Sequence, residues 1–443
     1  MQLKGLRQIG KSEIVRNVAT LSVGSVVSQL IPVLMSFVLA RLYAPQDYGD
    51  LGVFVNCAGI LTVFSCGRYE YAIVRPQREV DALNLMALSG MIAVGVSLLT
   101  FAVFAVGTAL KVAPLAQFPC KYGLPLVLLF MAVFQILGNY ANRCEKYRIL
   151  TASNIVRSVV QALTRLGLGV LQVGTGLITG CMAGWAGGCA VYAAQARLSG
   201  AVRRCFSWKR IGELAVRYKD FPRYLMTGNL LSALSNNLPV LILAAFYSKE
   251  SIGYFSMALA VLYLPVMYVG VAIGQVFYKK ASAWQIESTN RLAGRFFLFS
   301  AVLAILMFSV LLAGGPSMFR FLLGEHWGTV GLYSIYLSPW LMLVFCILPL
   351  GWIFDARDRQ KTEMGLKLLS FIVRIAVVLA GSYCGLSFAA VLLLYSASGV
   401  GLCLLEGYFI YKTLQMKADV RQKTIFFVCL AAVLAVWVFR VCR

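Results

Sequence analysis

The sequence alternates between long apolar runs and short polar clusters. The apolar runs are roughly 20 residues long, which is the length that a helix needs to cross about 30 Å of hydrocarbon. Backbone groups in lipid must be hydrogen-bonded within the protein, and barrel strands would alternate with a period of two residues, so these runs predict helices. We therefore expect an all-α polytopic membrane protein with twelve spans and a shorter thirteenth run. The expected spans are 17–40, 48–67, 82–110, 122–142, 152–173, 176–196, 224–246, 253–278, 296–314, 331–354, 364–384 and 386–411, and the shorter run is 424–439.

The composition agrees with this pattern. Apolar residues make up 60% of the 443 residues and charged residues only 13%. A soluble domain of this size needs more charged residues to cover its surface. The net charge of +23 would suit a nucleic-acid-binding protein, but that function needs a basic face on a soluble domain, which the pattern does not contain. We expect membrane lipids as partners and no nucleic acid.

The cysteines do not suggest a metal centre. All twelve are scattered singly without a CxxC pair, and His326 is the only histidine. They are typical of small buried hydrophobic residues, so we expect no metal or other cofactor. The first apolar run follows four basic residues like a signal peptide. It is too long for the apolar region of a signal peptide and no A-x-A site follows, so we expect it to remain as the first span.

Basic residues predict the orientation. With the N-terminus inside, the cytoplasmic loops and adjoining helical turns hold 30 lysines and arginines, whereas the outer loops hold 5. This asymmetry is typical of a cytoplasmic N-terminus. No outer loop exceeds about 16 residues, so we expect no extramembrane catalytic domain and no enzymatic activity. The inner connection at 197–223 mixes basic and apolar residues, and both an interfacial helix and an ordinary solvated linker fit it.

Two similar halves are expected. An even number of spans in each half gives parallel repeats. The segments LYAPQDYGDLGVF (42–54) and FYSKESIGYFSMA (246–258) align Tyr43 with Tyr247 and Gly49 with Gly253. In spans five and eleven, an arginine is followed eleven residues later by Gly-Leu. We therefore predict an N-terminal lobe at 1–196, a linker at 197–223, a C-terminal lobe at 224–411, and a basic loop with an extra hydrophobic helix at 412–443.

Arginines within the spans are the candidate functional residues. Arg165 and Arg374 lie too deep in their spans for the side chains to reach the surface easily. Amide side chains on several spans would line the same wet cavity between the halves. The acidic residues lie in loops or near span ends, Glu406 lying nearest to a span interior, so the cavity would be positive and suit a phosphate or pyrophosphate. The predicted anion-binding residues are Arg165, Arg374, Arg157 and Arg143, and the predicted polar lining is Gln161, Asn139, Asn229, Asn236, Asn237 and Gln29.

Each arginine also has a structural interpretation. In the less favoured interpretation, Arg165 and Arg374 donate to backbone carbonyls or amide side chains and lock helices together. Arg157 and Arg143 lie close enough to the cytoplasmic surface for their side chains to reach it. Arg41, at the outer end of the first span, suits an anchoring role.

Residues 218–282 resemble a known family. The FP before span seven, SNNLP within it, the IGYFSMA turn and the GQVFY run look like the start of the C-terminal half of bacterial polysaccharide-biosynthesis flippases. These are the Wzx-type O-antigen and lipid-linked oligosaccharide translocases of the multidrug/oligosaccharidyl-lipid/polysaccharide exporter (MOP) superfamily. RLYAPQDYGDLGVF resembles the family's first outer turn.

The resemblance implies a MATE-like, V-shaped bundle of two six-helix lobes in the bacterial inner membrane, working by alternating access. It implies transfer of a polyprenyl-pyrophosphate-linked oligosaccharide to the outer leaflet, with polysaccharide polymerases or glycosyltransferases as partners. It supplies no individual functional residue. One alternative is a cation-coupled drug exporter of the same superfamily, which would need buried carboxylates. The others are a glycosyl polymerase or ligase, which would need a larger outer loop, and a purely structural scaffold, which would need no intramembrane arginines.

Overall fold

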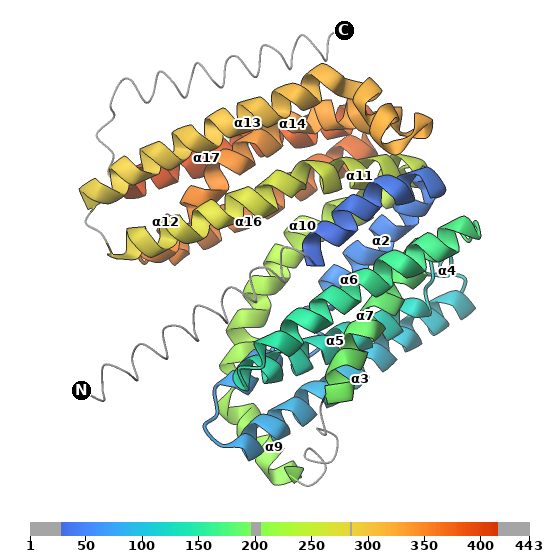
Figure 1. Ribbon diagram of the computed structural model, residues 1–443, viewed down its shortest axis with the longest axis vertical. Helices are drawn as coiled ribbons and strands as arrows, with labels where there is room; N and C mark the ends of the chain where they lie inside the picture. Colours follow the sequence, from blue (N-terminus) through green and yellow to red (C-terminus); the bar gives the residue numbers. More distant parts are fainter. Residues whose placement is uncertain (1–27, 196–204, 284–285, 415–443) are drawn as a thin grey trace. The chain divides into compact units, whose positions relative to one another are not determined.

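The structure, a computed structural model, describes residues 28–195, 205–283 and 286–414, and the regular elements in these ranges are all helical (Figure 1). This confirms the predicted all-α membrane fold. The start of the first expected span, part of the expected linker and the run at 424–439 lie outside the described residues.

The chain divides into two compact units, 1–237 and 238–443, and the division falls within helix α10 (Met226–Phe246). The first unit contains a helix at Ser28–Leu42 and the following elements: α2 (Pro45–Leu61), η1 (Tyr69–Val74), α3 (Glu79–Ala109), α4 (Ala113–Ala116), α5 (Gly123–Arg143), α6 (Tyr147–Val170), α7 (Gly176–Gln195), α9 (Trp208–Arg217) and η2 (Phe221–Leu225).

The second unit is organised around α14 (Gly328–Gly351), which is buried along most of its length. It packs against α11 (Lys249–Pro265), α13 (Ile286–Leu323) and α17 (Phe388–Leu414). The remaining elements are η3 (Val266–Gly270), α12 (Val271–Ala283), η4 (Glu325–Trp327), α15 (Ile353–Ala356) and α16 (Gln360–Tyr383).

Among the described residues, nine helices are long and apolar enough to cross a membrane. The protein is therefore a multi-pass membrane protein. The three other expected spans coincide with helices that meet this standard less well. The described part of the first, Ser28–Leu42, and α2 are short, and α6 carries several charged and amide side chains within its apolar sequence. The expected number of twelve spans stays a prediction.

Prolines and glycines change the regular helices at specific points. Pro265 has no backbone N–H, and the helix passes into the π-helix η3 directly after it. Gly315, with φ of 45°, kinks α13 immediately before Pro316. The expected span 253–278 covers η3, and the expected span 296–314 ends directly before the kink at Gly315.

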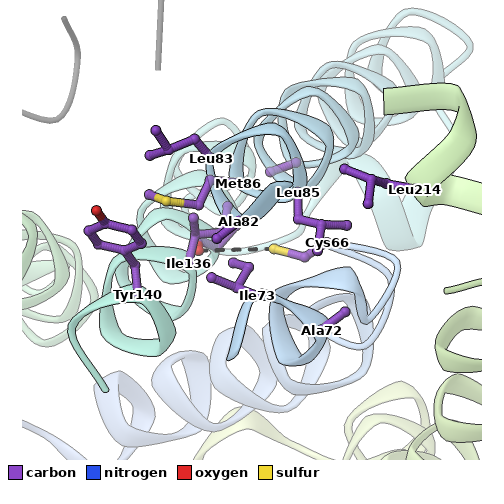
Figure 2. Packing of buried hydrophobic residues seen from close by; sticks show 12 residues of the cluster. Cys66, Ala72, Ile73, Ala82, Leu83, Leu85, Met86, Ile136, Tyr140 and Leu214 are labelled. Carbon is purple, nitrogen blue, oxygen red and sulfur yellow. Dashed lines mark hydrogen bonds between the residues drawn. The ribbon is translucent and has the colours of Figure 1, made fainter. Parts of the chain in front are cut away.

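A buried cluster holds one end of the first unit together (Figure 2). Cys66, Leu85 and Ile136 come from the turn after α2, from α3 and from α5, and Leu214 joins them from α9. The Cys66 thiol lies 3.9 Å from the carbonyl oxygen of Ala132, which is drawn as the dashed line in Figure 2. This packing places α9 against the end of α3.

Candidate functional site

Three predicted site residues share one face of α6. Arg157, Gln161 and Arg165 are spaced four residues apart, so they lie above one another on the helix. The face lies against α7, where glycines recur with the same spacing. A Cβ atom at Gly180 would lie 2.4 Å from Cγ of Arg165, and one at Gly184 would lie 2.7 Å from Cβ of Gln161. The glycines therefore form a groove on α7, and the polar face of α6 packs into this groove.

Arg165 is bound within this interface. Its Nε donates to the carbonyl oxygen of Leu177 on α7 at 3.0 Å. With its amide oxygen turned toward Arg165, Gln161 accepts from both terminal nitrogens at 3.0 and 3.3 Å. The backbone carbonyl of Arg165 also accepts a 2.7 Å hydrogen bond from the hydroxyl of Tyr43. These contacts join α6, α7 and the C-terminal end of the helix Ser28–Leu42.

Arg157 is held differently, by aromatic faces. Its guanidinium carbon lies 4.5 Å from the ring centre of Trp185 on α7 and 5.9 Å from that of Phe134 on α5. The two rings meet edge to face with centroids 5.2 Å apart. The Nε atom of Arg157 is buried and has no hydrogen-bond partner. The aromatic quadrupoles stabilise the cation but leave its donors available.

Arg374 has the same arrangement in the second unit. Its guanidinium carbon lies 4.5 Å from the ring centre of Trp340 on α14 and 5.6 Å from that of Tyr395 on α17. NH1 makes a long 3.4 Å contact to the Tyr395 hydroxyl, and Nε is buried without a hydrogen-bond partner. Trp340 is itself packed tightly, because a Cβ at Gly399 would lie 2.5 Å from its ring.

None of these three guanidiniums forms an ion pair with a carboxylate in the described ranges. Each unit therefore contains, within its described helices, guanidiniums that form no ion pair, although the carboxylate of Glu406 on α17 interacts electrostatically with Arg374. The described residues also contain no group of histidines, cysteines and acids that could hold a metal ion.

Arg143 lies at the C-terminus of α5 and binds a turn. Its guanidinium donates to the carbonyl oxygens of Ile73 and Val74 at 3.3 Å, to that of Gln77 at 3.2 Å, and to that of Pro76. Because its donors are directed at these four carbonyls, Arg143 fixes the connection between η1 and α3.

The predicted amides do not form one cluster within the first unit. Asn139 donates to the carbonyl of Gln135 at 3.0 Å, within its own helix. Asn237 donates to Ala233 at 2.7 Å, and its side-chain oxygen lies 2.8 Å from where a Cβ at Gly59 would stand. The remaining three are exposed or half-buried: Gln29, Asn229 and Asn236.

Sequence reasoning missed the aromatic partners of the arginines and the glycine groove. Trp185, Trp340 and Tyr395 are apolar residues within apolar spans, so nothing in the pattern distinguishes them from lipid-facing residues. The glycines did carry a signal. GLITGCMAGWAGG begins at Gly176 and repeats glycine every four residues, which is typical of a close helix–helix contact.

Comparisons with known proteins agree with this arrangement. A family model described as polysaccharide biosynthesis protein matches residues 14–278. No curated protein matches the sequence. Several solved structures share the fold at low sequence identity.

Three of these structures illustrate the likeness. The inward-facing conformation of a multidrug resistance MATE family transporter of the MOP superfamily is 12% identical, with a TM-score of 0.65 over 91% of this chain and 100% of that chain. The lipid II flippase MurJ in an inward closed conformation is 13% identical, with a TM-score of 0.63 over 95% and 96%. A MOP superfamily transporter from Pyrococcus furiosus is 11% identical, with a TM-score of 0.57 over 91% and 95%. The chain therefore has the fold of MOP-superfamily transporters.

Proposed function

Because the chain belongs to the polysaccharide biosynthesis protein family, we propose that it is a flippase for a polyprenyl-pyrophosphate-linked oligosaccharide. The substrate would be an O-antigen-type or capsule-type repeat unit, carried from the cytoplasmic to the outer leaflet of the bacterial inner membrane. The N-terminus would lie in the cytoplasm, as the basic loops predict. The likeness to MurJ, a lipid II flippase, supports the lipid-linked class of substrate.

One observation carries the proposal: arginines lie within the helices of both units, and in the part of the chain that the structure describes Arg157, Arg165 and Arg374 form no ion pair with a carboxylate. A guanidinium withdrawn from water is costly to bury unless an opposite charge compensates it. A pyrophosphate supplies that charge and accepts hydrogen bonds from the planar guanidinium donors. A cationic drug would instead be repelled, which disfavours the drug-exporter alternative.

We assign the main binding role to Arg157 and Arg374. Both are stabilised through their faces by tryptophan rings, so their edges keep donors for an anion. Arg165 remains a proposed contributor to the positive field, although its donors already serve Gln161 and Leu177. Alternating access would require two states of the protein, and the substrate would act by binding them with different affinity.

The test is transport by purified protein in liposomes that contain the lipid-linked repeat unit, together with its accumulation in the cytoplasmic leaflet of cells. Losing a hydrogen bond to a charged group costs about 1.5–3 kcal/mol. Arg157→Ala and Arg374→Ala should therefore each slow transport by roughly tenfold to a hundredfold. Arg165→Ala combined with Arg374→Ala tests the contribution of the positive field.

The matched controls separate charge from geometry. Arg374→Lys keeps the charge but loses the planar stacking, so it should recover only part of the rate. Arg320→Ala removes an exposed arginine and should leave transport unchanged. Normal export by Arg157→Ala/Arg374→Ala at equal expression would contradict the assigned binding residues, and efflux of a cationic drug by the wild type would favour the alternative.

A further inference from the structure

The amphipathic helix α9 is fastened to the first turns of α3. Arg210 donates two hydrogen bonds to the carboxylate of Asp81, from Nε to Oδ1 at 2.7 Å and from NH2 to Oδ2 at 2.9 Å. Asn84 donates to the carbonyl of Cys205 at 2.9 Å and accepts from the backbone N–H of Ser207 at 3.0 Å. This paired arrangement fixes the start of α9 against α3, and α9 lies at this end of α3 in Figure 1.

These contacts set the level of α9 along the membrane normal. Asn84 is the sixth residue of α3, roughly 7.5 Å along its axis from Glu79. The continuous apolar sequence of α3 starts in this same turn, so Asp81 and Asn84 mark the boundary between headgroups and hydrocarbon. The start of α9 therefore lies level with the membrane interface, and not in the solvent beyond it.

Only part of the apolar surface of α9 is covered by protein. Ile211 and Leu214 are buried, and Leu214 points into the cluster drawn in Figure 2. Trp208, Gly212 and Val216 follow one another at four-residue spacing and form an adjacent apolar strip. Trp208 is 69% exposed and Val216 is 67% exposed. The strip is thus apolar, contiguous with the buried face, and uncovered by the described residues.

Aromatic and basic side chains border this strip. Phe206 packs edge to face on Trp208, with ring centroids 5.0 Å apart. Lys209 is exposed beside Val216 of the strip. Arg217 is exposed further around the helix, beyond Glu213, whose carboxylate pairs with Arg210 at 2.7 Å. Exposed aromatic residues next to lysine and arginine are typical of helices that lie in the interface and contact anionic headgroups.

We propose that Phe206, Trp208 and Val216 insert among the lipids of the membrane face on which α9 lies, and that Lys209 and Arg217 bind anionic phospholipid headgroups there. The arginine–aspartate contact to Asp81 would hold α9 at the correct depth. This surface serves membrane lipid and is separate from the arginines proposed to bind the transported substrate.

The experiment uses the full-length protein in vesicles of phosphatidylcholine, with and without phosphatidylglycerol, that contain phospholipid brominated near the headgroup end of its acyl chains. The fluorescence difference between wild type and Trp208→Phe isolates the emission of Trp208. We expect bromine to quench this emission, and phosphatidylglycerol to increase the quenching. Lys209→Gln/Arg217→Gln should abolish the increase and keep the quenching in phosphatidylcholine.

A matched variant controls for the loss of two positive charges. Lys146→Gln/Arg148→Gln removes exposed cations near the start of α6 and should retain the phosphatidylglycerol effect. Quenching of Trp208 by aqueous iodide and not by brominated lipid would overturn the proposal, because α9 would then lie in solvent. Quenching that is equal with and without phosphatidylglycerol would overturn the assignment of an anionic headgroup.

Discussion

At the scale of single residues, several charged side chains are buried while some of their polar atoms have no hydrogen-bond partner. A cation–aromatic contact contributes up to about 2 kcal/mol when it is withdrawn from water. The effective desolvation penalty for a buried ion is several kcal/mol. We propose that the uncompensated part of this penalty at Arg157 favours binding of an anion. At Arg374 the carboxylate of Glu406 supplies part of the compensation, and the proposed substrate would supply the rest.

A carboxylate in the first unit is likewise buried with only part of its charge compensated by a neighbour. Glu70 in η1 is 1% exposed, and its Oε1 lies 3.6 Å from NH1 of Arg68. The other carboxylate oxygen and Nε of Arg68 are buried without hydrogen-bond partners. Arg68 itself is in the left-handed region, with φ of 62°, directly after Gly67. Burial is the main cause that raises the pKa of Glu70, and Arg68 only partly opposes it.

This pKa shift predicts a pH dependence of stability. A carboxyl whose pKa is raised in the folded state binds its proton more tightly there than in the unfolded chain. Its favourable contribution is complete below the ordinary carboxyl pKa and is lost as the pH rises through the raised value. The free energy of unfolding of the wild type, relative to Glu70→Gln, should fall over that window.

Thermal unfolding in detergent at a series of pH values measures this difference. Glu145→Gln removes an exposed carboxylate and controls for the general loss of one negative charge. A wild type that becomes more stable relative to Glu70→Gln with rising pH would contradict the prediction.

At the scale of helices, the two units use a related tyrosine contact. The hydroxyl of Tyr43 donates to the carbonyl of Arg165 at 2.7 Å, and the hydroxyl of Tyr247 donates to that of Leu386 at 2.8 Å. Each tyrosine follows the first helix of its predicted repeat and binds the region of spans five and six of that repeat. The alignment of Tyr43 with Tyr247 in the sequence thus has a physical counterpart in each unit.

Removing either hydroxyl should therefore have a similar effect. Tyr43→Phe and Tyr247→Phe should each lower the free energy of unfolding by about 0.5–1.5 kcal/mol, because each loses one hydrogen bond. Tyr383→Phe, at an exposed tyrosine, is the control and should change stability little. Thermal or denaturant unfolding checks these values, and a large effect of only one of the two substitutions would argue against equivalent roles.

The glycine groove of α7 gives a second prediction at this scale. Gly180→Ala would place a methyl group 2.4 Å from Cγ of Arg165, so α6 and α7 would have to separate. We expect a loss of about 1–3 kcal/mol in stability, the usual result of overpacking. Gly95→Ala in α3 meets no atom within 4 Å and should be neutral or slightly stabilising. Melting temperatures of the two variants should therefore shift in different directions or by clearly different amounts.

Hydropathy predicted the helices well because lipid acts on whole segments. The expected spans 122–142 and 364–384 correspond closely to α5 and α16. Hydropathy did not predict helix ends or side-chain contacts, because these depend on individual neighbouring residues. The span expected at 48–67 ends earlier, since α2 stops at Leu61 and turns lead into η1. The position of Arg374 within an apolar run was readable from the sequence, whereas its contact with Trp340 depends on how α16 and α14 each pack against α17.

At the scale of the whole molecule, the orientation in the membrane remains a prediction that native thiols can test. Cys144 follows α5 and Cys384 follows α16, and both are exposed. The asymmetry of the basic loops places Cys144 in the cytoplasm and Cys384 outside. The two thiols are therefore natural reporters for opposite faces of the membrane.

A membrane-impermeant maleimide should label Cys384 in intact cells and should reach Cys144 only after the membrane is opened. The background is Cys120→Ser/Cys429→Ser/Cys442→Ser, which removes the half-buried thiol in the predicted outer loop before α5 and the thiols near the C-terminus. In that background Cys384→Ser should abolish labelling of intact cells, and Cys144→Ser should leave it unchanged. The reverse pattern would invert the topology, and the proposed substrate would then have to enter from the opposite leaflet. In the reverse orientation the thirty basic residues of the predicted cytoplasmic loops and adjoining turns would lie outside, against the positive-inside rule, so we expect labelling at Cys384.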